Sequence, residues 1–152
     1  MDDELRDLYQ EVILDHSKRP RNFGHPASSN RRARGDNPLC GDRMDLYLTL
    51  EDGVVTDVAF VGHGCAISMA SASLMTEMIK GKPADEVRAL FDRFHRFVTD
   101  DAAGPDVPDE LDKLSVFAGV RQFPVRVKCA TLAWHTLAAA LDGEVEDVST
   151  ED

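Results

Sequence analysis

The chain has 152 residues, with 28 Asp and Glu against 17 Lys and Arg, and its formal net charge at pH 7 is −11. This length fits a single domain with a substantial core, and the acidic charge disfavours nucleic acid as a partner, because phosphates would be repelled. The start is acidic and no apolar stretch reaches membrane-spanning length, which indicates a cytoplasmic protein with no membrane partner.

The first part of the chain is predicted to hold one helix, a loop and a hairpin. Apolar residues at helical spacing predict an amphipathic helix that ends at about His16. Residues 20–38 are rich in Pro, Gly, Asn and Ser, and we expect a long loop with a short strand near its end. Apolar and polar residues alternate over 44–51, which predicts a half-buried strand. This strand turns at Asp52-Gly53 into a second strand over 54–61, so that we expect an antiparallel hairpin.

The second part is predicted to be helical. Helices are expected over residues 66–80, from Pro83 to about Val98, from Pro108 to about Phe117, and over the apolar segment 130–141, which should be central. We therefore expect an α+β fold: one domain over 1–143, with a small antiparallel β-sheet packed with helices. The acidic segment 144–152 is expected to be a disordered tail.

The three cysteines are the most informative residues of the chain. Cys40 and Cys65 lie in glycine-containing segments at the edges of predicted elements, and Cys129 is expected to open the last helix. Such positions favour thiolates, whereas small core residues would lie inside apolar elements, so we favour ligands over core packing. Asp42 follows Cys40 by two residues and shares its face of an extended strand. Three thiolates and a carboxylate complete a tetrahedral metal site at one end of the fold, and the oxygen ligand suggests a site that can open.

Charged residues and histidines near these cysteines allow further interpretations. Arg126 and Lys128 flank Cys129 and are expected to keep thiolates deprotonated. His63 and Cys65 could form a hydrolytic pair, but no oxyanion hole is evident and the other cysteines would be unexplained. The remaining histidines are expected to be packed or solvated, with His135 the most buried.

A basic strip precedes the first cysteine. From Ser17 to Gly35 the chain has six Lys and Arg residues and no Asp or Glu. This strip is either a solvated arm or a surface that steers an acidic protein partner, and the sequence does not favour one over the other.

Three segments that contain the cysteines resemble the motifs of a known family. Residues 37–43 (NPLCGDR), 62–68 (GHGCAIS) and 127–130 (VKCA) are similar to those of the IscU and NifU-N iron-sulfur assembly proteins, over nearly the whole chain to about Gly143. Scaffold-type members carry a histidine immediately before the third cysteine, where this chain has Lys128. That difference, and an apparent insertion around residues 91–106, resemble the SufU branch.

The resemblance implies a function and partners. It implies zinc bound by Cys40, Asp42, Cys65 and Cys129, and a protein that accepts sulfur from a pyridoxal-phosphate cysteine desulfurase for downstream iron-sulfur assembly proteins or apoproteins. Cys40 is the expected sulfur acceptor, released when the partner supplies a replacement ligand to zinc. The protein is thus a sulfurtransferase-type relay rather than a small-molecule enzyme.

Two alternative functions use the same four residues. The chain could be a scaffold on which a transient 2Fe-2S iron-sulfur cluster is assembled and then transferred to apoproteins. It could instead be an interaction module that zinc only stabilises, in which case cysteine substitutions would change stability but not the desulfurase rate.

Overall fold

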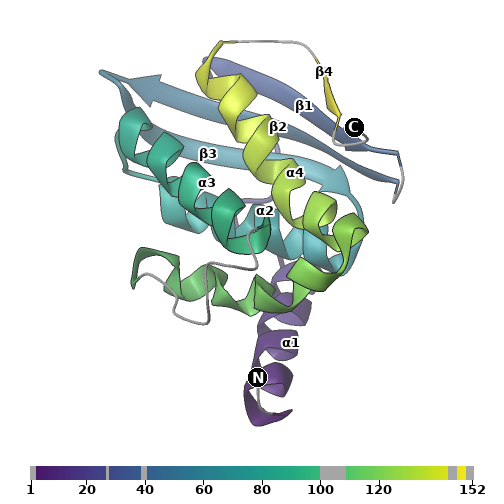
Figure 1. The fold of residues 1–152 in the computed structure, drawn as a ribbon. Helices are drawn as coiled ribbons and strands as arrows, with labels where there is room; N and C mark the ends of the chain where they lie inside the picture. The colour runs from purple at the N-terminus through teal and green to yellow at the C-terminus, as the bar shows by residue number, and fades with distance from the viewer. Residues whose placement is uncertain (1–2, 27, 39–40, 100–108, 144–146, 150–152) are drawn as a thin grey trace.

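The computed structural model describes residues 3–26, 28–38, 41–99, 109–143 and 147–149. In chain order the elements are α1 (Asp3–Lys18), β1 (Arg31–Asn37), β2 (Asp42–Glu51), β3 (Val54–His63), α2 (Ala66–Ile79), α3 (Ala84–Thr99), the 3-10 helix η2 (Asp109–Gln122), α4 (Pro124–Leu141) and β4 (Asp147–Ser149). Figure 1 shows α4 crossing the sheet, with α3 beside it and α1 extending away. None of the described helices is long and apolar enough to cross a membrane.

The sheet has the strand order β3-β2-β1-β4. β1, β2 and β3 are antiparallel, and the expected α+β fold with a small antiparallel sheet is confirmed. Asp52 and Gly53 join β2 to β3 with φ angles of 53° and 79°, the two positive values that a tight hairpin turn needs. β4 adds a short parallel pairing with Arg34–Asp36. It lies within the segment 144–152 for which the sequence predicts disorder, so residues 147–149 form a strand where none is expected; the rest of that tail lies outside the described residues.

The core lies between the inner face of the sheet and the helices. Met44 and Leu48 of β2 are at most 1% exposed and alternate with half-buried residues of the outer face. Trp134 of α4 is fully buried and lies beside the rings of Phe91 and Phe94 of α3, which confirms the central position predicted for the last helix. β1 and α4 pack so closely that a Cβ added at Gly35 would overlap the hydroxyl of Thr136.

The segment 109–122 differs from the expected short α-helix. It is a 3-10 helix, and its buried residues include Leu114, Phe117 and Val120, which are three positions apart. A helix with three residues per turn places such residues on one face, whereas an α-helix would rotate them gradually away from the core. Residues 100–108, which precede this helix, lie outside the described residues.

The histidines also differ from expectation. His16 of α1, rather than His135, is the buried one, and its Nδ1 lies 2.7 Å from the Ser73 hydroxyl of α2. His135 is half-buried, and its ring lies edge to face with that of His95 on α3, at a centroid distance of 5.7 Å. A helix that is apolar overall can still turn one polar side chain toward a neighbouring helix.

Candidate metal centre

Cys65 caps the amino terminus of α2. β3 ends at His63, and Cys65 adopts an extended backbone, so that its Sγ accepts a hydrogen bond from the Ser68 N–H at 3.4 Å. Ser, Thr, Asp or Asn normally occupies such a position, because it satisfies a free N–H of the first turn. A thiolate there is stabilised by this hydrogen bond and by the positive end of the helix dipole. The position of Cys65 at a strand-to-helix junction is confirmed.

Asp42 is the first residue of β2 and is fully buried. Its Oδ1 accepts a hydrogen bond from the Cys65 N–H at 2.8 Å, and its Oδ2 lies 3.9 Å from the Cys65 Sγ. The approach requires glycine at position 64, because a Cβ there would lie 2.5 Å from Oδ1 of Asp42. One carboxylate oxygen is thus fixed by the backbone, and the other faces the sulfur.

Cys129 lies inside α4 rather than at its start. The helix begins at Pro124, so the prediction that Cys129 opens it is wrong. Proline is favoured at the first position of a helix, where its missing N–H is not needed, and Phe123-Pro124 therefore begins the helix instead of leading to it. Cys129 is 2% exposed, and the packing of α4 on β1, not a helix dipole, sets its position.

These three residues converge although they are far apart in the sequence. One ligand atom from each of Asp42, Cys65 and Cys129 lies within 4.8 Å of the others. Zinc bonds of about 2.0–2.3 Å place neighbouring donors roughly 3.3–3.8 Å apart, so a small contraction of this cluster makes three corners of a tetrahedron. The donor set fits zinc and leaves one corner for another ligand. The sequence predicts Cys40 there, but residue 40 lies outside the described residues.

The electrostatics of the cluster favour a thiolate at Cys65. Its hydrogen bond with Cys129 lowers the pKa of Cys65 to about 7, with help from the N–H groups of Ser68 and Ile67, while burial and the charge of Asp42 oppose this. A thiol with a pKa near 7 is substantially ionised at neutral pH, and the ionised form is the one that binds metals.

Asn37 also belongs to the cluster, although its residue type and position in the sequence predict no role for it. It is the last residue of β1, it pairs directly with Asp42 across the β1–β2 ladder, and it is fully buried. Its Nδ2 donates a hydrogen bond to the Cys129 Sγ at 3.8 Å, and its Oδ1 is buried with no hydrogen-bond partner among the described residues. No local pattern in the sequence predicts this contact, because Asn37 and Cys129 are 92 positions apart.

Two other residues expected to act on the cysteines, Arg126 and His63, are exposed. Arg126 is exposed, and its guanidinium lies 4.4 Å from the centroid of the Phe123 ring, so its described contact is with this ring. His63 is exposed at the end of β3, whereas the Cys65 sulfur has described hydrogen bonds with Asp42, Cys129 and the N–H groups of Ser68 and Ile67. A hydrolytic His63–Cys65 pair gains no support from this arrangement.

Several cations of the basic strip already have acidic partners. Arg19 and Arg21 both contact the carboxylate of Asp15, at 2.9 and 2.7 Å, and Arg34 contacts Asp45 at 2.9 Å. These ion pairs reduce the positive potential that the bare sequence suggests. A role of the strip in steering a partner stays a prediction.

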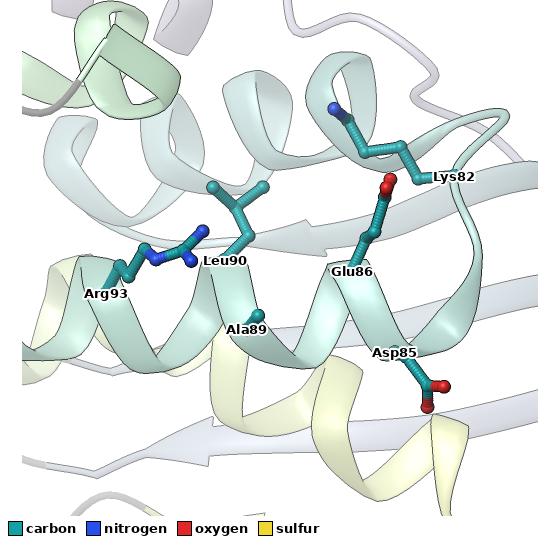
Figure 2. Close-up of a pocket in the computed structure, with 6 residues that line it drawn as sticks. All are labelled: Lys82, Asp85, Glu86, Ala89, Leu90 and Arg93. Atoms are coloured by element: carbon teal, nitrogen blue, oxygen red, sulfur yellow. The ribbon is translucent and has the colours of Figure 1, made fainter.

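A surface hollow on α3 is chemically unlike the cysteine cluster. It has a volume of about 490 Å³ and is lined by Lys82, Asp85, Glu86, Ala89, Leu90 and Arg93. Figure 2 shows Glu86 extending toward Lys82 while Asp85 points away. Mixed charges without a cysteine or histidine offer no site for sulfur or zinc chemistry, so the candidate site is the cluster of Asp42, Cys65 and Cys129.

Comparisons with known proteins agree with this geometry. Residues 8–130 match the family model of the NifU-like N-terminal domain. The chain is 42% identical over 135 residues to the "Zinc-dependent sulfurtransferase SufU" of Bacillus subtilis, which covers 88% of each chain. It is 40% identical over 140 residues to the "Iron-sulfur cluster assembly scaffold protein IscU" of Streptococcus pyogenes, covering 91% of this chain and 85% of that one.

A solved structure shows the same fold. The putative iron-sulfur cluster assembly scaffold protein for the SUF system from Fervidobacterium islandicum superimposes with a TM-score of 0.80 at 33% identity, covering 92% of this chain and 99% of that one. The sequence match, the fold and the cluster of Asp42, Cys65 and Cys129 agree with one another. The chain therefore belongs to the NifU-like N-terminal domain family of iron-sulfur cluster assembly proteins, which includes IscU and SufU.

Proposed function

We propose that this protein is a zinc-dependent sulfur acceptor that takes persulfide sulfur from a cysteine desulfurase and passes it on within iron-sulfur cluster assembly. The observation that carries the proposal is the buried carboxylate of Asp42 beside the sulfur atoms of Cys65 and Cys129. An oxygen donor among thiolates suits a site that exchanges a ligand better than a closed structural site of thiolates alone. The name of the Bacillus subtilis relative, a zinc-dependent sulfurtransferase, supports the same function.

In this proposal Cys40, Asp42, Cys65 and Cys129 hold the metal, and zinc, when bound, keeps the thiolates deprotonated. The transfer is an exchange between sulfur atoms. The thiolate of Cys40 attacks the outer sulfur of the desulfurase persulfide, and a new S–S bond forms at Cys40. The S–S bond within the desulfurase breaks, and its cysteine leaves as a thiolate. No external oxidant or reductant is needed, and Asp42, Cys65 and Cys129 keep their places throughout.

A second candidate is the assembly scaffold. The Streptococcus pyogenes relative and that of Thermotoga maritima, which is 38% identical over 135 residues, are both named iron-sulfur cluster assembly scaffold proteins. The same thiolates could bind iron and sulfide. Lys128 argues against this candidate, because it stands where scaffold-type members are expected to have a histidine next to the third cysteine.

One experiment separates the two functions. The protein is incubated anaerobically with iron, cysteine and a cysteine desulfurase, followed by metal analysis, absorption spectroscopy and mass mapping of persulfides. Retained zinc with a persulfide on Cys40 supports the sulfur relay, whereas a stable cluster chromophore in high yield supports the scaffold.

The desulfurase turnover assay tests the acceptor directly. Cys40→Ser should abolish stimulation of the desulfurase, while Ser29→Ala, in the loop before β1, should stimulate like the wild type. Full stimulation by Cys40→Ser would refute the proposed function. Loss of stability on zinc removal, with no effect of cysteine substitutions on the rate, would indicate an interaction module instead.

A further inference from the structure

Asn37 and Asp42 form a pair at the base of the hairpin that joins β1 to β2. They lie opposite each other in the ladder, both are fully buried, and each contacts a cysteine from a distant element. Asp42 contacts Cys65 of the β3–α2 junction, and Asn37 contacts Cys129 of α4. The two contacts differ in chemistry, because a carboxylate only accepts hydrogen bonds while a carboxamide also donates them.

The amide nitrogen of Asn37 must be the atom that faces Cys129. In the metal-bound protein Cys129 would be a thiolate, which accepts a hydrogen bond but has no proton to donate, so the carbonyl oxygen would be repelled by it. The N–H bond from Nδ2 then shares part of the negative charge of the sulfur. A sulfur whose electron pairs are drawn into a hydrogen bond is a weaker nucleophile, although it still binds a metal.

We propose that Asn37 is a positioning residue that orients the Cys129 sulfur toward the metal and reduces its nucleophilicity, so that incoming sulfur is not transferred to Cys129. The orienting part follows from the contact itself. The selectivity part rests on the proposed function. Transfer to the wrong thiolate would balance chemically just as transfer to Cys40 does, since in both cases one S–S bond forms as another breaks. A device that lowers the reactivity of one sulfur would therefore be useful here.

Cobalt spectroscopy of the full chain tests the orienting part. In the Co(II)-loaded protein, Asn37→Leu removes the donor at similar size, and Asn37→Asp keeps the shape but replaces the donor with a negative oxygen. Both should move the sulfur-to-cobalt charge-transfer band to lower energy and weaken cobalt binding about 10- to 100-fold, the usual effect of losing a partner of a metal ligand. Asn30→Leu, which removes an exposed amide bonded to Leu50 outside the site, should change neither.

A measurement on the unsubstituted protein guards against variants that fail to fold. In the ¹¹³Cd-loaded wild type, an Asn37 side-chain amide proton should show scalar coupling to the metal through the Cys129 sulfur. Unchanged charge-transfer bands in folded Asn37 variants, or the absence of that coupling, would overturn the assignment.

Persulfide mapping tests the selectivity part. After incubation with desulfurase and cysteine, the wild type should carry the persulfide on Cys40 alone, and Asn37→Leu should carry it on Cys129 as well. A persulfide confined to Cys40 in the variant would overturn the selectivity role. If no persulfide forms on the wild type, the proposed function fails, while the cobalt and cadmium results still decide whether Asn37 orients Cys129.

Discussion

Gly64→Ala offers a sharp test of how the backbone supports the metal centre. The added Cβ would lie 2.5 Å from Oδ1 and 3.0 Å from Cγ of Asp42. The carboxylate must then move away from the Cys65 N–H, with which it forms a bond of 2.8 Å. A hydrogen bond to a charged group contributes about 1.5–3 kcal/mol. If that loss appears in metal binding, zinc affinity falls roughly 10- to 150-fold, at 1.4 kcal/mol for each factor of ten.

The assay is competition for zinc against a chromophoric chelator at pH 7.5, with thermal unfolding of the metal-free protein measured in parallel. Gly119→Ala is the matched control, since a Cβ at Gly119 would meet no atom within 4 Å. We expect the control to bind zinc like the wild type. Wild-type zinc affinity in Gly64→Ala would show that Asp42 does not depend on this close approach, and the account of its position would be wrong.

Three further outcomes are expected. Asp42→Asn should lower the pKa of Cys65 in the metal-free protein, because the carboxylate charge raises it, and the pH dependence of Cys65 alkylation measures this; an unchanged pKa would contradict the described contact. Burial, and to a smaller extent the charge of His95 on α3, lower the pKa of His135 below its ordinary value of 6.5. The unfolded chain therefore binds a proton at this residue more readily than the folded protein, and the free energy of unfolding falls as the pH drops below about 6.5. His135→Gln should flatten this part of the pH profile of urea unfolding, and an identical profile would refute the assignment. Gly35→Ala should cost about 1–3 kcal/mol by overpacking against Thr136, and the added change Thr136→Ala should restore part of that stability in the same urea assay; additive losses would contradict the direct contact.

Local patterns in the sequence predicted the elements, and several boundaries were set by tertiary packing. The alternation of apolar and polar residues before Asp52-Gly53 predicts the β2–β3 hairpin correctly. The apolar face of the hairpin and its turn residues both indicate the same register. Residues 109–122 form a 3-10 helix where an α-helix is predicted, and the three-residue spacing of Leu114 and Phe117 fits this tighter helix. The predicted start of helix α4 is too late, because Pro124 is the first residue of the helix and not part of an extended approach to it.

The candidate site was predicted by residue type, while its hydrogen bonds needed the fold. Asp42, Cys65 and Cys129 were identified from ligand chemistry and motif likeness, and the structure brings these three together. Asn37 and Cys129 are 92 positions apart in the sequence, and no local sequence pattern predicts a contact between residues so far apart. The buried His16 likewise contacts a residue distant in the sequence, Ser73, which is 57 positions away.

Asn37 and Asp42 pair directly in the β1–β2 ladder, and this pairing limits how far a sulfur accepted at position 40, as proposed above, could travel. Two peptide units separate position 40 from Asp42, and two fully extended units span at most about 7 Å. A segment this short cannot carry a bound sulfur between two sites that lie far apart on the molecule. Under the proposed function, the donor protein would therefore have to bring its persulfide close to the cluster of Asp42, Cys65 and Cys129, and the next sulfur acceptor would have to approach the same end of the molecule.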